Sequence, residues 1–168
     1  VMIGEIRDRE TAEIAIQSAL TGHLVLATLH TNDALSAFTR LVDMGVEPYL
    51  VAAATQAVMA QRLVRRLCAV CAAPGGAPVG ESGGSWRSPV GCRNCQHTGY
   101  RGRQGIYELV TVDEALRHAV ASLAPAGEIE RIANARGRRS LREDGMIKAR
   151  RGETSVEEVI RVAGADLA

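Results

Sequence analysis

Four cysteines, the whole cysteine complement of the chain, fall as two C-x-x-C pairs with twenty residues between the pairs. Two thiolates that close one short turn can face the same metal ion, and a second such turn completes the tetrahedral S4 set that structural Zn²⁺ prefers. Four protein ligands leave no open position for water, so we expect a structural rather than a catalytic site. The predicted ligands are Cys68, Cys71, Cys92 and Cys95.

The same spacing also fits two disulfides, a redox-active pair, or a single iron ion in the same S4 cage. The sequence shows no secretory leader pattern, and its composition is that of an ordinary globular protein rather than a disulfide-rich one. Together with the paired spacing, this favours zinc.

Composition bounds the remaining possibilities. The 168 residues are 46% hydrophobic and 23% charged, which is typical of a soluble protein with one core and a small additional module. No apolar run approaches the roughly 18 residues that a membrane span requires, so we expect a cytoplasmic protein. Aromatic residues make up only 3% and the net charge is +1, which argues against nucleic acid as a partner.

Positive charge is nevertheless concentrated around the cysteines. The stretch from Arg62 to Arg103 contains seven arginines and one acidic residue, Glu81. Part of this excess compensates the four thiolates of the expected metal site. The remainder predicts a surface that contacts an acidic partner or anionic lipid head groups, with Arg65, Arg66 and Arg101 as its candidates.

The first third of the chain predicts an α/β arrangement. The run VMIG suggests a buried parallel strand that delivers Glu5 at its carboxyl end, where ligands bind in open α/β sheets. Asp8 is a candidate cap for a helix that ends near Gly22. The continuous apolar run 23–29 predicts a second strand covered on both faces. We expect His23, at the start of that strand, to have a packing or interface role. The Asn32-Asp33 pair can cap a further helix that ends at Gly45.

The remaining elements follow from local patterns. Pro48 predicts the start of a long helix that runs to about Leu67 and directly into the first cysteine pair. Residues 72–89 hold five glycines and three prolines, so we expect a flexible excursion there. The segment GYRGRQGIYEL predicts a small strand or hairpin. Asp113 is a candidate cap, and two capping boxes, beginning at Ser140 and Ser155, predict helices in the C-terminal region.

Several segments resemble the type II secretion and type IV pilus assembly ATPases. GEIRDRETAEIAIQSALTGHLVLATLHTND resembles their Walker B and histidine-box region. LVDMGVEPYL, GCRNCQHTGYRGRQGIYEL and SLREDGMIKARRGETSVEEVIRVAG resemble the segments that follow, in the family's order. The resemblance covers essentially the whole chain and leans toward the type II secretion branch, with pilus assembly as the near alternative.

This resemblance implies a fold and a set of roles. It implies part of a RecA-like nucleotide-hydrolase core, followed by a small tetracysteine zinc module and a C-terminal helical region, at residues 1–67, 68–110 and 111–168. Glu5 matches the Walker B glutamate that positions the attacking water beside the Mg²⁺ of ATP. His30 and Thr28 would sense the nucleotide, and Arg7 and Asp8 would hold the loop after Glu5, for instance as an ion pair. The implied whole is a homo-hexamer, peripheral at the inner membrane, with secretion-platform proteins and anionic phospholipids as partners.

One element of the family pattern is missing from this sequence. A phosphate-binding loop needs G-x-x-x-x-G-K-[ST], and the chain's one lysine, Lys148, lies in a different context. We therefore expect the C-terminal half of a motor subunit, cut from something longer and inactive alone. The competing hypothesis is a non-enzymatic zinc-ribbon module that binds protein or nucleic acid.

Overall fold

The parallel strand at the N-terminus and the helix after it form where the sequence predicts, but the predicted burial of this strand is wrong, because Met2 is 82% exposed and Ile3 is only half-buried. The computed structural model describes residues 1–81 and 83–164. Strand β1 (Met2–Ile3) pairs in parallel with β2 (Leu26–Ala27), with Met2 opposite Leu26. Helix α1 (Arg9–Leu20) connects them, and the Asp8 side chain accepts a hydrogen bond from the amide of Thr11 at its start.

The second strand is less covered than predicted. Val25 and Leu29 pack against the hydrophobic core, but Leu24 and Leu26 are 75% and 56% exposed. The described part of this sheet contains only β1 and β2, so nothing in it covers the face that carries Leu24 and Leu26. The prediction of burial on both faces is therefore wrong for this chain.

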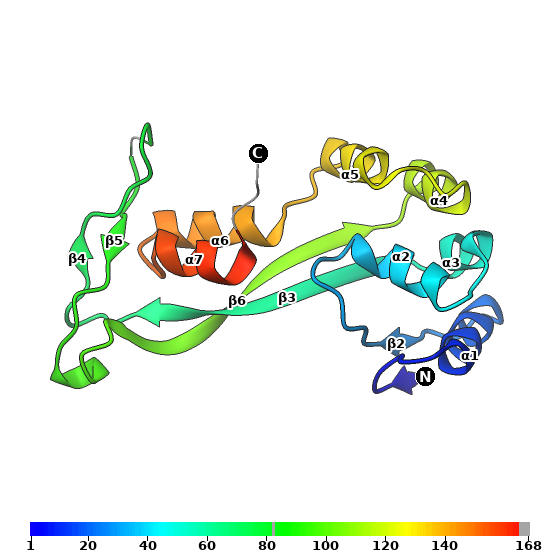
Figure 1. Cartoon of the computed structure of the whole chain (residues 1–168), viewed down its shortest axis with the longest axis horizontal. Coiled ribbons are helices and arrows are strands. Elements are labelled where there is room, and N and C mark those ends of the chain that lie inside the picture. The colour runs from blue at the N-terminus through cyan, green and yellow to red at the C-terminus, as the bar shows by residue number, and fades with distance from the viewer. Residues whose placement is uncertain (82, 165–168) are drawn as a thin grey trace. The chain divides into compact units, whose positions relative to one another are not determined.

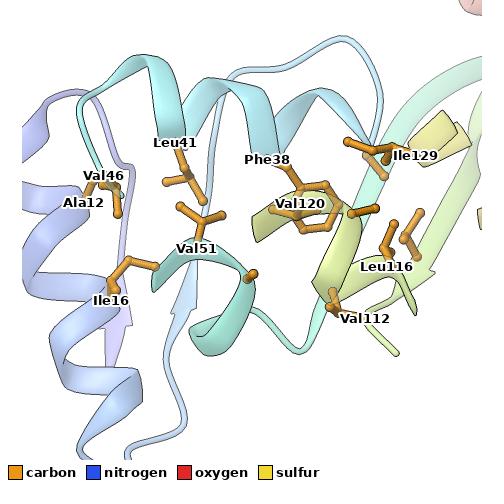
Figure 2. Close-up of a cluster of buried hydrophobic side chains, with 14 of the residues drawn as sticks. Ala12, Ile16, Phe38, Leu41, Val46, Val51, Val112, Leu116, Val120 and Ile129 are labelled. Carbon is orange, nitrogen blue, oxygen red and sulfur yellow. The ribbon is translucent and has the colours of Figure 1, made fainter. Parts of the chain in front are cut away.

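A hydrophobic core joins the N-terminal helices to two later ones. Helices α2 (Ser36–Asp43) and α3 (Pro48–Ala54) lie beside α4 (Glu114–Ala121) and α5 (Ala126–Ala135). Figure 2 shows their buried side chains meeting around Phe38, the chain's one phenylalanine. Arg117 of α4 donates hydrogen bonds to the carbonyls of Ala52 and Ala53, so it satisfies carbonyls that the end of α3 leaves free. The labelled core residues are Ala12, Ile16, Phe38, Leu41, Val46, Val51, Val112, Leu116, Val120 and Ile129.

The prediction of one long helix from Pro48 to Leu67 is wrong. Helix α3 ends at Ala54, and the chain continues as strand β3 (Ala57–Leu67), which pairs with β6 (Tyr100–Thr111). The two arrows point in opposite directions in Figure 1. Alanine, glutamine, arginine and leucine in this segment favour a helix locally. The hydrogen bonds offered by a distant strand override that preference, as tertiary context commonly does.

The cysteine-bearing region is a set of short elements with two helices. Strands β4 (Ala73–Pro74) and β5 (Arg87–Ser88) pair antiparallel, so the segment predicted as a flexible excursion begins and ends in a short ladder. A 3-10 turn, η1 (Arg93–Cys95), follows. Helices α6 (Leu141–Arg150) and α7 (Val156–Ala163) pack closely at Gly145, where a Cβ would approach the Val159 side chain to 2.7 Å.

The structure divides into two compact units. The first comprises Val1–Ala60 and Leu109–Arg138, and the second comprises Gln61–Glu108 and the chain from Arg139. The boundaries therefore fall within β3, within β6 and between α5 and α6, whereas the three-part division predicted from motifs cuts the chain after residues 67 and 110. None of the described helices has the length and apolarity needed to cross a bilayer.

Candidate catalytic carboxylate and tetracysteine cluster

The backbone on both sides of Glu5 is fixed by one residue of the neighbouring strand segment. The hydroxyl of Thr28 donates to the carbonyl of Gly4, at 2.5 Å, and the carbonyl of Thr28 accepts from the amide of Ile6, at 2.9 Å. Glu5 therefore has a defined backbone position just past the end of β1. Thr28, predicted as a nucleotide sensor, contacts the backbone of this loop in the structure.

The two carboxylate oxygens of Glu5 have different partners. Oε2 accepts a hydrogen bond from Nε of Arg7 at 2.7 Å and forms an ion pair with Nη2 of the same guanidinium at 2.5 Å, while Oε1 lies 2.8 Å from Nε2 of His30. The Glu5 side chain is 19% exposed, whereas those of Arg7 and His30 are 76% and 88% exposed. The hydrogen bond from Arg7 lowers the pKa of Glu5 against the effect of burial, so the carboxylate is ionised at neutral pH.

The other polar residues of this region have local roles. Asp8 caps α1, and its hydrogen bonds from Thr11 lower its pKa. Arg7 therefore pairs with Glu5 and not with Asp8. His23 is exposed at the end of α1, where its Nδ1 lies 3.3 Å from the carbonyl oxygen of Ser18.

The four cysteine side chains converge on one point. All four Sγ atoms lie within 4.8 Å of one another, and three of the separations are 3.7, 3.8 and 4.0 Å. A tetrahedral ion with bonds of about 2.3 Å to sulfur places its ligands roughly 3.8 Å apart. All four cysteines are free, so the described structure forms no disulfide among them. The geometry is compatible with a tetrahedral metal site.

Backbone amides point at the sulfur atoms. Gly91 donates to Cys71 at 3.3 Å, and the amides of Cys92 and Gly99 both donate to Cys95 at 3.2 Å. Burial raises the pKa of Cys95, but the donors from Cys92 and Gly99 outweigh it and lower that pKa to about 6, which favours the thiolate that binds metals. At Cys71, burial outweighs the donor from Gly91 and raises the pKa to about 11. Gln96 and His97 adopt positive φ angles to turn the chain under the cluster, a feature that no sequence pattern predicted.

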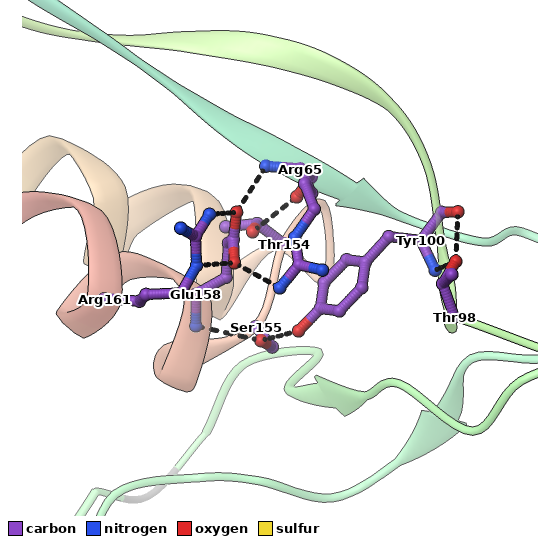
Figure 3. Close-up of polar contacts among 7 residues, drawn as sticks. All are labelled: Arg65, Thr98, Tyr100, Thr154, Ser155, Glu158 and Arg161. Atoms are coloured by element: carbon purple, nitrogen blue, oxygen red, sulfur yellow. Dashed lines mark hydrogen bonds and ion pairs between the residues drawn. The ribbon is translucent and has the colours of Figure 1, made fainter.

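A buried acid that sequence reasoning missed lies beside the predicted arginine surface. The carboxylate of Glu158 accepts hydrogen bonds from Arg65 and Arg161, and Figure 3 shows this network. The Arg65 guanidinium also lies 4.0 Å from the ring centroid of Tyr100. Arg65 is thus largely engaged within the protein. Arg101 donates to Asn94 at 2.8 Å, and Arg66 is exposed.

Comparison with known proteins shows which family the chain belongs to. Residues 1–161 match the family model described as "Type II/IV secretion system protein". The chain belongs to this family. It is 54% identical over 162 residues to the type II secretion system protein HxcR of Pseudomonas aeruginosa, covering 96% of this chain and 33% of that protein. It is 51% identical to the type II secretion system protein E of Aeromonas hydrophila, covering 99% of this chain and 35% of that protein.

A pilus relative and a solved structure extend the comparison. The type IV pilus assembly ATPase PilB of Thermus thermophilus is 48% identical, with 95% of this chain and 19% of that protein covered. The ATPase DotB of Legionella pneumophila matches with a TM-score of 0.66 at 22% identity, over 98% of this chain and 38% of that one. The similarity confirms the predicted fold class, part of a RecA-like α/β core with a tetracysteine module. This family member spans about a third of the length of its type II relatives.

Proposed function

We propose that this chain supplies the catalytic carboxylate and the metal module of an ATPase motor that drives pseudopilus assembly and protein export by type II secretion. The observation that carries the proposal is the arrangement at Glu5, whose carboxylate is ionised, held at the end of a parallel strand and within 2.8 Å of His30. Phosphoryl transfer requires mainly a positioned water and neutralised charge, and a fixed carboxylate meets the first requirement.

Each residue of this site has a proposed role. Glu5 orients the attacking water and accepts its proton. His30, whose side chain is 88% exposed, leaves Glu5 to contact the terminal phosphate of the nucleotide. Bound Mg²⁺ would neutralise charge on the phosphates of ATP. The phosphate-binding loop comes from a part of the full-length motor that this chain does not contain, so the chain alone does not turn over ATP.

The four cysteines hold a structural Zn²⁺ in this proposal. The sulfur separations match a tetrahedral ion, and the amides of Gly91, Cys92 and Gly99 stabilise the thiolates. Zinc supplies folding energy here and no chemistry, because all four positions belong to the protein.

Partners follow from the family and from charge. We propose a homo-hexamer at the cytoplasmic face of the inner membrane, bound to secretion-platform proteins and anionic phospholipids. Arg66 and Arg101 remain the candidates for that contact, while Arg65 serves mainly to hold Glu158. Charge reversal at Arg66 and Arg101 in the full-length motor should weaken binding to anionic vesicles at low salt, and unchanged binding would contradict this role.

Two other functions remain as alternatives. The type IV pilus relatives, at 46–48% identity, make a pilus assembly ATPase the nearer one. A non-enzymatic zinc-ribbon module is less supported, because the match runs through the Glu5 and His30 region as well as the cysteines.

The test is Glu5→Gln in the full-length motor. We expect ATP hydrolysis to fall by about 10²- to 10⁴-fold while ATP binding is retained, because the base is lost and the phosphate contacts are not. Glu13→Gln is the matched control, since Glu13 also pairs with a nearby arginine, Arg9, but lies on the exposed side of α1. Parent-like hydrolysis by Glu5→Gln would overturn the proposal.

A further inference from the structure

Arg7 makes an unequal contact with the Glu5 carboxylate. Nε donates a hydrogen bond to Oε2, Nη2 forms an ion pair with the same oxygen, and Oε1 is left to His30. A water that is to be oriented by Glu5 needs one carboxylate oxygen free. Because His30 is the more exposed partner and touches only Oε1, its departure exposes one defined oxygen while the other stays bonded.

The acceptor in this pair is fixed, which distinguishes it from an ordinary surface ion pair. Glu5 is 19% exposed, and Thr28 holds the backbone on either side of it. In the comparable pair on α1, the side chains of Arg9 and Glu13 are 68% and 49% exposed, so both ends of that pair are open to solvent. A guanidinium that is bonded to one oxygen of a fixed carboxylate determines the direction in which the other oxygen points.

We propose that Arg7 is a positioning residue for catalysis: it stays on Oε2 of Glu5 during turnover and aims Oε1 at the attacking water. This inference rests on the proposed function of Glu5 and extends it to a residue that the sequence assigned only to holding the loop. In this role Arg7 acts through Glu5 and needs no contact of its own with nucleotide or water. Its guanidinium also keeps the carboxylate ionised when His30 has left.

The structure indicates that Arg7 can be removed without unfolding the protein. Exposed ion pairs contribute little to stability, typically under about 1 kcal/mol. The Thr28 contacts that fix the backbone of Glu5 do not involve the Arg7 side chain. Arg7→Ala therefore tests orientation rather than folding.

The experiment compares Arg7→Ala with Arg9→Ala in the full-length motor. We expect Arg7→Ala to lower kcat by about ten- to a hundredfold with KM for ATP within about twofold of the parent, because misplacing a catalytic group affects the reaction step. Millimolar, non-denaturing guanidinium should restore part of the kcat of Arg7→Ala, since the site is open to solvent. Arg9→Ala should keep parent kcat and show no response to guanidinium.

A second arm tests whether Arg7 acts through Glu5. In the Glu5→Gln background, adding Arg7→Ala should cause no further loss of kcat, because the carboxylate that Arg7 orients is already absent. A full additional loss, a parent-like kcat in Arg7→Ala, or a loss that guanidinium does not restore would each overturn the inference. If Glu5→Gln itself hydrolyses ATP like the parent, the proposed function fails. If Glu5→Gln is inactive while Arg7→Ala is unaffected, only this inference fails.

Discussion

Glu158 is buried, yet all of its hydrogen-bonding capacity is used. Oε1 accepts from the amide of Arg65 and from Nη2 of Arg161, and Oε2 accepts from Nη2 of Arg65 and Nε of Arg161. Burial raises the pKa of this carboxyl, but the donors from Arg161 and Arg65 outweigh it and lower the pKa to about 2. A buried carboxylate with two guanidinium partners is stabilising only while it is charged.

The charge state of Glu158 therefore makes stability depend on pH. Its pKa in the folded protein lies below the unfolded value, so its contribution is complete above about pH 4.5 and is lost as the pH falls toward 2. A shift of this size corresponds to about 3 kcal/mol. We expect Glu158→Gln to be destabilised at pH 7, with the difference from the parent shrinking below pH 4.5. Denaturant unfolding across this pH range measures it.

Glu157→Gln provides the control for that titration. Glu157 lies on the same helix and is exposed. Its substitution should leave the stability profile unchanged within about 0.5 kcal/mol. If the difference in unfolding free energy between the parent and Glu158→Gln stayed constant from pH 7 to pH 2, the pH dependence would not come from Glu158.

At the scale of elements, the sequence predicted helix starts better than strands. Asp8, Asp113 and Ser140 each cap the helix that their local pattern indicated, because a cap is a contact between residues three apart. Strand β3 was missed because its partner, β6, lies far along the chain and no local pattern reveals that pairing. Glu158 was recognised only as part of a capping box, because its partner Arg65 also lies far away in the sequence. Ser155 does cap α7, but the carboxylate turns to Arg65 instead.

The same contrast holds for the candidate sites. The cysteine ligands were predictable from spacing, since two short turns suffice to define them. The pairing of Glu5 with Arg7 and His30 could not be predicted in this way, because it depends on how β1 and β2 align. The resemblance named these residues without giving their contacts.

Side chains on β3 offer a direct test of its strand character. Val64 is fully buried and its neighbour Leu63 is 47% exposed, as expected for successive residues on opposite faces. We expect Val64→Ala to cost about 2 kcal/mol of unfolding free energy, because it leaves a cavity. Leu63→Ala should cost under about 0.5 kcal/mol. Similar losses for both variants in thermal or denaturant unfolding would contradict this description.

At the scale of the whole molecule, the two compact units have different sources of stability. The hydrophobic cluster around Phe38 belongs to the first unit, whereas the cysteine cluster lies in the second. Metal binding in a small module contributes folding free energy locally. Loss of the metal is therefore expected to affect the second unit selectively.

Elemental analysis and hydrogen exchange test this expectation in the chain itself. We expect one zinc per chain, and loss of that zinc in Cys68→Ser or Cys92→Ser. Amides at Gly91, Cys92 and Gly99 should then exchange faster, while those of α1 stay protected. Val70→Ser is the matched control, because Val70 lies between two ligands but is exposed. Substoichiometric metal in the parent, with four freely titrating thiols, would contradict the zinc assignment.

The position of the cysteine cluster along the chain has a further consequence. Cys68 follows directly on the last residue of β3, and Gly99, whose amide binds Cys95, directly precedes the first residue of β6. The amide of Cys68 donates to the carbonyl of Gly99 at this point, and in the proposed zinc-bound state the four thiolates would take the place of a hairpin turn and join the ends of the two strands by coordination. Chain closure then costs little more when the intervening segment grows, since the entropic penalty rises only with the logarithm of loop length. Residues inserted at Gly80, where an added Cβ would meet no atom within 4 Å, would lengthen that segment, and in the proposed zinc-bound state we expect the strand register to stay unchanged.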